Sequence, residues 1–159
     1  METILFELNA NVARITLNRP DVHNAFNDIM LAELIEIFTA VRKRKGEIRV
    51  VVLTGNCKSF CAGADLNWMK KMIHYSYEEN LEDSNQVSEC MYQLYTLPMP
   101  TIARVNGAAI GGGMGLVAAS DIVVAQEKAV FSLSEVKLGL VPACISPYLI
   151  RRAGESKCP

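Results

Sequence analysis

Three consecutive glycines, Gly111, Gly112 and Gly113, are the residues of this 159-residue chain best suited to binding a ligand through the backbone. They follow an apolar run at 101–106 and precede another at 114–119, which predicts a strand, a glycine turn and a helix. The first turn of a helix presents N–H groups without intrahelical partners, and glycine leaves them accessible. Close packing of helix on strand would also favour glycine, so the triplet alone leaves both roles open.

A second segment, AGADL at 62–66, has a similar setting. It follows a predicted strand and leads into a predicted helix at 66–72. Asp65 by itself is typical of a helix N-cap. Two strand-to-helix junctions built from small residues can, however, direct two backbone N–H groups at one oxygen atom, which is the requirement of an oxyanion hole. The pair therefore predicts a site that stabilises negative charge developing on a carbonyl oxygen.

Two nucleotide-binding motifs are excluded by the residues around the glycine triplet. A P-loop requires Gly-Lys-Ser/Thr, but Gly113 follows Gly112. A dinucleotide-binding fingerprint that starts at Gly111 requires glycine at position 116, where Leu116 stands. Neither kind of phosphate binding is predicted here.

The histidines and cysteines indicate no other site. His23 and His74 lie on different predicted elements, so a Ser-His-Asp triad has no support. The cysteines form no CxxC pair and have no neighbouring histidine, so no metal site is predicted. Cys61, beside the second glycine segment, is interpreted as a packing residue. The five cysteines are Cys57, Cys61, Cys90, Cys144 and Cys158.

Strand and helix patterns alternate along the chain, which is typical of an α/β fold. Apolar runs at 4–8 and 12–17 predict a hairpin, and apolar residues at helical spacing predict an amphipathic helix from Asn27 to Gly46. The capping-box pattern of Ser76 and Glu79 predicts a helix that continues to residue 97. Strands are predicted at 48–54, 101–106, 121–124 and 129–131, and short helices at 66–72, 114–119 and within 134–154.

Composition excludes several classes of protein. The net charge is −1, from 16 basic and 17 acidic residues, so the basic surface of a nucleic-acid binder is not expected. No apolar run reaches the roughly 20 residues that span a bilayer, and the first residues do not match a secretory signal. These features predict a cytoplasmic protein with reduced cysteines, folded as one domain over residues 1–159.

Three motifs together carry a family resemblance: FCAGADL at 60–66, PTIARVNGAAIGGG at 100–113 and FSLSEVKLGLVP at 131–142. In order and spacing they resemble the crotonase superfamily, also called enoyl-CoA hydratase/isomerase, and the likeness covers essentially the whole chain. It implies the ClpP/crotonase fold, a spiral of ββα units followed by a helical domain that builds trimers. Residues 1–159 are expected to be the N-terminal core domain, incomplete and without that C-terminal helical domain.

The resemblance also implies a substrate and partners. The stretch from Ser134 to Ser156 looks closest to bacterial methylglutaconyl-CoA hydratase-like proteins of leucine and terpenoid breakdown. The substrate implied is an acyl-CoA thioester, with no cofactor besides the coenzyme A that the substrate carries, no metal, no nucleic acid and no membrane. The full-length protein is expected to be a homo-oligomer, either a trimer or a dimer of trimers.

By motif position, the resemblance gives roles to individual residues. The backbone N–H groups of Ala64 and Gly112 would hold the thioester oxygen, and Glu135 would be the catalytic acid and base. The apolar neighbours of Glu135 are expected to raise the pKa of its carboxyl group. These neighbours are Leu133, Val136, Leu138 and Leu140. The residues expected to bind coenzyme A are Ala62, Ala64, Asp65, Leu66, Asn67 and Gly112.

Gly115 departs from the family pattern. Hydratases with two glutamates carry the second carboxylate at this position, and glycine has no side chain. A single base can still move a proton between carbons, which is isomerase chemistry. Three functions therefore remain open: hydration of a 2-enoyl-CoA by Glu135, isomerisation of a 3-enoyl-CoA to a 2-enoyl-CoA, and binding of acyl-CoA by a fragment without turnover.

Overall fold

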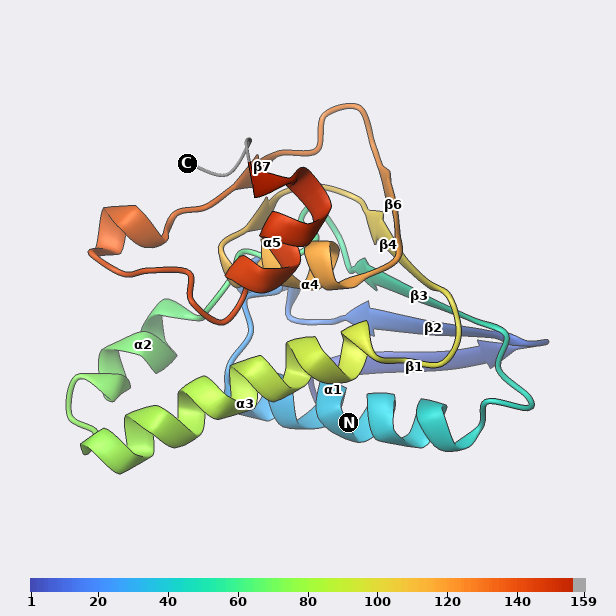
Figure 1. Cartoon of the computed structure of the whole chain (residues 1–159), viewed down its shortest axis with the longest axis horizontal. Helices are drawn as coiled ribbons and strands as arrows, with labels where there is room; N and C mark the ends of the chain where they lie inside the picture. The colour runs from blue at the N-terminus through green and yellow to red at the C-terminus, as the bar shows by residue number, and fades with distance from the viewer. Residues whose placement is uncertain (156–159) are drawn as a thin grey trace.

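A five-stranded sheet forms the centre of the computed structural model, which describes residues 1–155. Its strand order is β1-β2-β3-β4-β6 (Figure 1). β1 pairs antiparallel with β2, and the other neighbours are parallel. The predicted hairpin and α/β class are confirmed. The strands are β1 (Ile4–Asn9), β2 (Val12–Leu17), β3 (Val50–Gly55), β4 (Thr101–Val105) and β6 (Ile122–Ala125).

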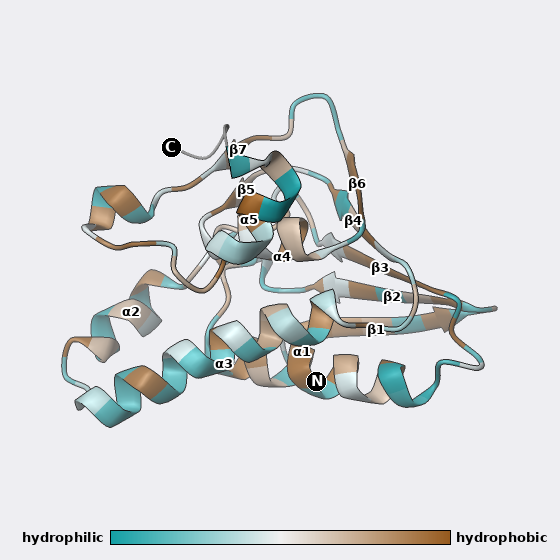
Figure 2. Cartoon of the chain, in the orientation of Figure 1, coloured by the Kyte–Doolittle hydropathy of each residue, from teal (hydrophilic) through white to brown (hydrophobic). Residues whose placement is uncertain are grey.

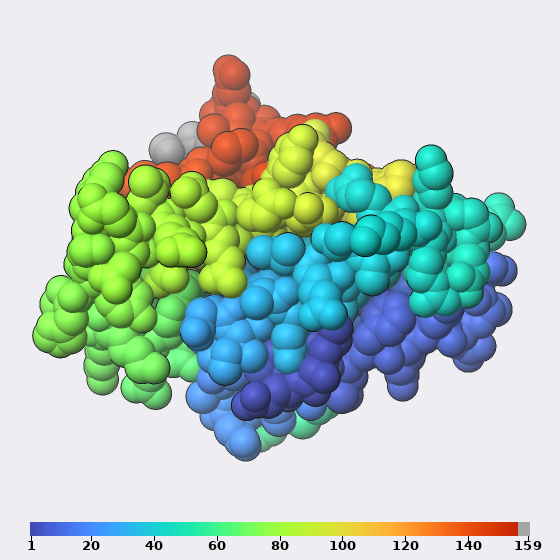
Figure 3. All heavy atoms as spheres, turned by 90° about the horizontal axis from the view of Figure 1, so that it is seen from below, coloured from blue at the N-terminus to red at the C-terminus, as the bar shows by residue number. Residues whose placement is uncertain are grey.

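Two long helices, α1 (Asp28–Lys43) and α3 (Tyr77–Tyr95), pack against each other beside this sheet. Figure 3 shows them next to one another on the lower face of the molecule. The predicted caps are present, because Asn27 accepts a hydrogen bond from the N–H of Met30, and Ser76 and Glu79 form a capping box. The other helical segments are α2 (Leu66–Met72), α4 (Gly112–Ala119), α5 (Ser146–Ala153) and the 3₁₀ turns η1 (Pro20–Val22) and η2 (Glu135–Leu138).

The chain repeats a ββα unit as it winds through the sheet. After each of the strands β2, β3, β4 and β6 comes a short extended segment and then a helix or 3₁₀ turn. Two of these segments, β5 (Ala109–Ile110) and β7 (Phe131–Ser132), form a second, parallel sheet. Isolated bridges from Cys61 to Ala109 and from Phe26 to Ala64 continue the layer. The predicted spiral is therefore confirmed. β5 was not predicted, because two residues are too short to show a strand pattern.

The predicted element boundaries differ from the structure by a few residues. α1 ends at Lys43 instead of continuing to Gly46, and β3 begins at Val50 instead of Ile48. The N–H of Ile48 donates to the carbonyl of Arg44, so this residue closes the turn after the helix. β3 is fully buried along one face and half-buried along the other. The short helix predicted within 134–154 is α5, which ends at Ala153, and residues 156–159 lie outside the described residues.

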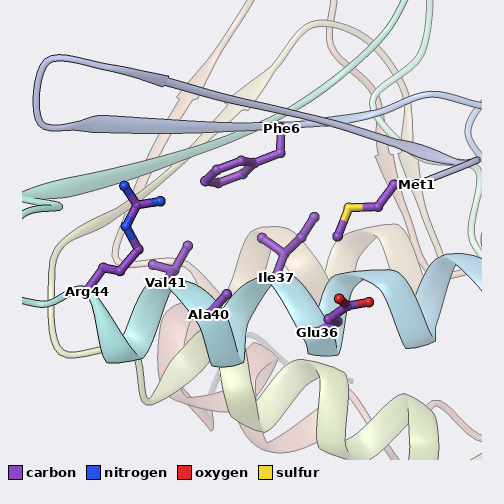
Figure 4. Close-up of a pocket in the computed structure, with 7 residues that line it drawn as sticks. All are labelled: Met1, Phe6, Glu36, Ile37, Ala40, Val41 and Arg44. Atoms are coloured by element: carbon purple, nitrogen blue, oxygen red, sulfur yellow. The ribbon is translucent and has the colours of Figure 1, made fainter.

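The buried apolar residues form one core between the sheet and the helices. Figure 2 shows hydrophobic colour on β3 and α1, which contribute to this core. No helix in residues 1–155 has the length and apolar character needed to cross a membrane. A small hollow of about 160 Å³ lies between β1 and α1. Figure 4 shows Phe6 of β1 and Ile37 of α1 beside it. None of the predicted site residues lines this hollow.

Candidate active site

Four successive turns of the spiral bring their strand-to-helix junctions together. The N–H of Phe26 donates to the carbonyl of Gly63, at 2.8 Å. The N–H of Ile110 donates to the carbonyl of Cys61 at 2.9 Å, and that of Gly111 donates to Ser132 at 2.8 Å. These parallel contacts align the starts of α1, α2, α4 and η2. Residues that are far apart in the sequence, from 26 to 135, therefore lie at one edge of the second layer.

The two predicted oxyanion donors lie at neighbouring junctions. In the described part of the chain, the N–H groups of Ala64 and Gly112 donate no hydrogen bond. Gly112 begins α4, so its N–H precedes the first intrahelical bonds. Gly63 has a φ of +89°, and a Cβ on it would lie 3.5 Å from the Gly112 nitrogen. The glycine at 63 thus brings two unused donors close together without a side chain between them.

Glu135 is the first residue of η2, in the next turn of the spiral. Its carboxyl group lies over the glycine triplet, since a Cβ on Gly111 would be 3.1 Å from Glu135 Oε1. The other carboxyl oxygen, Oε2, is buried without a hydrogen-bond partner among residues 1–155. The Glu135 carboxyl group therefore lies over Gly111, the residue next to Gly112, whose N–H is one of the two proposed oxyanion donors.

The apolar sequence neighbours of Glu135 are placed differently from one another. Leu138 and Leu140 line the same cavity as Glu135, although they are 52% and 48% exposed. Leu133 packs partly against the core, and Val136 is 72% exposed and does not line the cavity. Leu138 and Leu140 therefore contribute to the apolar wall beside Glu135, whereas Val136 does not.

A cavity of about 730 Å³ joins these groups. It lies between α2, the first half of α3, and the segment from η2 to the start of α5, which converge at the left of Figure 1. Ala64, Leu66, Gly112 and Glu135 are the predicted site residues that line it. Most of its wall is apolar, including Phe26, Met69, Met72, Val87, Val141 and Ile145. The space is suited to an acyl chain whose polar end reaches the free N–H groups.

Gly115 is buried behind Ile145, which lines another part of the cavity wall. A Cβ at this position would lie 2.3 Å from Ile145 Cγ2 and 3.2 Å from Met91 Cε. Ile145 is 3% exposed, so it cannot swing away into solvent. A two-glutamate hydratase would carry its second carboxylate at this position. In this chain the position has no carboxylate, and apolar side chains fill the space around it.

Comparison with known proteins agrees with this arrangement. Residues 7–159 match the family model described as enoyl-CoA hydratase/isomerase. The structure superimposes with a TM-score of 0.94 and 44% identity on an enoyl-CoA hydratase from Shewanella pealeana, over 98% of this chain and 58% of that one. The chain belongs to the enoyl-CoA hydratase/isomerase family. Its fold is the N-terminal part of the crotonase fold.

Members of the family with differently named activities are about equally similar to this chain. The bacillaene synthase dehydratase PksH of Bacillus subtilis is 38% identical over an alignment of 162 positions that covers 98% of this chain and 59% of that protein. The 1,2-epoxyphenylacetyl-CoA isomerase of Escherichia coli is 38% identical over an alignment of 169 positions that covers 99% of this chain and 60% of that protein. The chain thus spans less than two thirds of these relatives, and they share a family but not one reaction.

Asp65 has a structural task at the start of α2. Its Oδ1 accepts a hydrogen bond from the Asn67 N–H, and its Oδ2 pairs with Arg19 at 2.8 Å. Burial raises the pKa of Asp65, but these hydrogen bonds and the charge of Arg19 outweigh it and hold the pKa below its ordinary value. Arg19 also donates to the carbonyl of Ala25. The ion pair therefore fixes the segment before α1 to the segment before α2.

The other residues expected to bind coenzyme A are placed differently from one another. Leu66 is exposed at the cavity, whereas Ala62, Asp65 and Asn67 do not line it. The N–H of Ala62 donates to His23, and the N–H of Asp65 donates to Phe26. Binding of coenzyme A by this segment stays a prediction, and these engaged residues can offer only their carbonyl groups or side chains.

Three residues of the site were not identified from the sequence: Phe26, Trp68 and Asp83. A Cβ on Gly112 would lie 2.4 Å from Phe26 Cζ, so the phenyl ring covers that glycine. Trp68 packs edge-on against Phe26, with ring centroids 6.2 Å apart. Asp83 lines the cavity from α3. Asp83 could not be singled out in the sequence, because it lies in a helix with many other charged residues. Phe26 and Trp68 could have been noticed, because they are aromatic residues next to the recognised motifs.

Cys61 lies behind the site as the sequence predicted. Its side chain is completely buried, and burial raises the pKa of the thiol to about 12 despite hydrogen bonds with the backbone of Gly63 and Phe26. A thiol with this pKa stays protonated near neutral pH and is a poor nucleophile. A Cβ on Gly113 would meet the Cys61 carbonyl at 2.4 Å, so Cys61 packs directly under α4.

Proposed function

We propose that this chain binds a 2-enoyl-CoA thioester and adds water across its double bond. The observation that carries the proposal is the placement of one carboxyl group, that of Glu135, beside the free N–H groups of Ala64 and Gly112 in a largely apolar cavity. Such N–H groups stabilise the charge that develops on a thioester oxygen when an enolate forms. The hydratase name of the Shewanella relative supports the choice of reaction.

In this reaction, Glu135 acts first as a base and then as an acid. Its carboxylate takes a proton from water as the water oxygen bonds to the β-carbon of the substrate. The electron pair of the double bond moves toward the thioester, and the negative charge is held on its oxygen by the Ala64 and Gly112 N–H groups. Glu135 then returns the proton to the α-carbon. One carboxyl group is sufficient, so the absence of a side chain at Gly115 does not prevent hydration.

Isomerisation of a 3-enoyl-CoA is a second candidate, favoured by the packing at Gly115. Ile145 and Met91 leave no room there for a second carboxylate to activate water. In an isomerase, Glu135 would remove a proton from the α-carbon and return it to the γ-carbon. The dienolate formed in this way would be held in the same oxyanion hole, and the double bond would move without uptake of water.

Ultraviolet absorbance separates these reactions, because only the 2-enoyl thioester is conjugated. Loss of absorbance from a short or methylglutaconyl-type 2-enoyl-CoA would support hydration and the methylglutaconyl-like substrate proposed from the sequence. Gain of absorbance from a 3-enoyl-CoA would support isomerisation. Binding of both thioesters without a change in absorbance would refute both reactions and leave the non-catalytic acyl-CoA-binding role.

The chain spans less than two thirds of the length of the relatives named above, so statements about the whole protein are part of the proposal. We propose that it assembles as a homo-oligomer, a trimer or a dimer of trimers, as the family resemblance implies. We propose no cofactor besides coenzyme A, which is part of the substrate.

A further inference from the structure

Asp83 is a second carboxyl group in the wall of the cavity. Among residues 1–155, two buried side-chain oxygens have no hydrogen-bond partner, Glu135 Oε2 and Asp83 Oδ2. Both residues line the same cavity. Buried polar atoms without a partner are rare in folded proteins and call for an explanation. The proposed reaction explains Glu135 but does not use Asp83.

A row of side chains leads from the oxyanion hole to Asp83. The ring of Phe26 covers Gly112, and Trp68 packs against the edge of that ring. The Trp68 side chain in turn lies beside the Asp83 carboxyl group and acts to lower its pKa. Two aromatic rings therefore separate Asp83 from Gly112. Asp83 is too far from the oxyanion hole to act on the thioester carbonyl.

The position of Asp83 on α3 gives the same result. Val87 and Met91 follow it by one and two helical turns and lie on the same face. Met91 lies against Gly115 in the first turn of α4, whereas Asp83 lies about 12 Å back along the helix axis. Asp83 therefore lines a part of the cavity away from the two free N–H groups, where the proposed binding of the thioester would place the acyl chain beyond its β-carbon.

We propose that Asp83 determines substrate specificity by hydrogen-bonding to an oxygen atom carried on the acyl chain beyond the β-carbon. The proposal rests on the thioester chemistry proposed above and adds the class of acyl chain. Asn80 and Ser84 line the cavity beside Asp83, so this end of it is polar although most of its wall is apolar. A pure hydrocarbon chain would leave Asp83 Oδ2 buried without a partner, and binding would be weaker for that reason.

The surroundings of Asp83 affect how it can bind such an oxygen. Burial, followed by the negative charges of Asp28 and Glu82, raises the pKa of Asp83 above its ordinary value, against the opposing effect of the neighbouring Trp68 side chain. An ionised Asp83 accepts a hydrogen bond from a hydroxyl group. A carboxylate on the substrate can bind only to protonated Asp83, which then donates. The two kinds of oxygen can therefore be distinguished by substitution.

Equilibrium binding of saturated acyl-CoA thioesters tests the proposal without turnover. Three chains of equal length would be compared, which end in a methyl, a hydroxyl or a carboxylate group. We expect at least one oxygen-bearing chain to bind roughly tenfold more tightly than the methyl-ended chain. Asp83→Leu should abolish that preference. Asp83→Asn should retain binding of a hydroxyl and strengthen binding of a carboxylate, because the amide can accept and donate and carries no charge.

Glu78→Gln provides the control, since it removes an exposed carboxyl group from the same helix away from the cavity. Circular dichroism and thermal melting would show whether each variant is folded. Equal binding of the three chains by the wild type, or a preference that survives Asp83→Leu in a folded variant, would overturn the inference and leave the proposed function intact. Failure of the wild type to bind any of the thioesters would instead refute the proposed function.

Discussion

At the scale of single residues, the site depends on Gly112 and Gly115, where there is no space for a methyl group. The motif that contains Gly112 was recognisable in the sequence, as were Ala64 and Glu135. The sequence alone did not show which side chains fill the space above these glycines. These side chains, Phe26 and Ile145, come from other turns of the spiral. Contacts between residues so far apart in the sequence depend on the three-dimensional path of the chain.

Gly115→Ala should destabilise the fold by about 1–3 kcal/mol, because the new methyl group would overlap Ile145. Chemical denaturation would measure the free energy of unfolding. Gly46→Ala is the matched control, as a Cβ there has no neighbour within 4 Å. Ile145→Ala should be destabilising alone, but the double variant should lose less than the sum of the single losses. Strict additivity would contradict direct contact between these positions.

Asp83→Asn should stabilise the protein near neutral pH. The pKa of Asp83 is raised, so ionising this group costs the folded state free energy that the unfolded state does not lose. Removing the charge should raise the free energy of unfolding and the melting temperature only slightly, because solvent screens a partly exposed carboxyl group. The gain should shrink as the pH falls below about 4, where the carboxyl group is protonated even in the unfolded chain. Equal or lower stability of the variant at pH 7 would contradict this account.

At the scale of elements, the spacing of apolar residues and the caps predicted the long helices well. The short second strands were harder to predict, since β5 and β7 have two residues each. They are defined by pairing with other turns and not by their own sequence. The same limit applies to η2, where Leu138 and Leu140 line the cavity beside Glu135 as the expected apolar setting requires, but Val136 is exposed and does not line it. Local patterns identify an element but do not determine its neighbours.

The start of α2 should be sensitive to acid through Asp65. Asp65→Asn keeps the capping oxygen but removes the charge that pairs with Arg19, and should cost about 1–2 kcal/mol at pH 7. Asp65→Ala removes the cap as well and should cost more. Because the pKa of folded Asp65 is lowered, its contribution is present above the ordinary value of about 4 and is lost as the pH falls through the lowered value.

The measurement is the free energy of unfolding of wild type and Asp65→Asn from pH 7 down to pH 3. Their curves should converge at the acidic end. A difference that stays constant over this range would show that the Arg19 pair does not contribute through the charge of Asp65.

At the scale of the whole molecule, exposed apolar side chains are frequent after residue 121. Figure 2 shows hydrophobic colour along β6, the outer strand of the large sheet next to β4. The exposed side chains in this region include Val124, Val130, Phe131, Val136 and Val141. Proteins rarely leave large apolar patches and sheet edges uncovered. The resemblance to a trimeric family predicted such contacts, but a single sequence could not show which surface makes them.

We expect this 159-residue chain to self-associate in a concentration-dependent way, which analytical ultracentrifugation would detect. Val124→Lys places a charge on the edge strand and should weaken association without changing the circular dichroism spectrum. Lys128→Arg, in the loop after β6, keeps the charge pattern and serves as the control. A monomer at all concentrations would contradict this interpretation of the apolar surface.

The central claim is that Glu135 forms an enolate from a thioester held by the Ala64 and Gly112 N–H groups, whichever product follows. Exchange of the α-hydrogens of a saturated acyl-CoA for deuterium, followed by nuclear magnetic resonance in heavy water, tests that step directly. The account predicts exchange with the wild type, a loss of roughly 100-fold or more in Glu135→Gln, and unchanged thioester binding by that variant. Exchange at the wild-type rate in Glu135→Gln would contradict it.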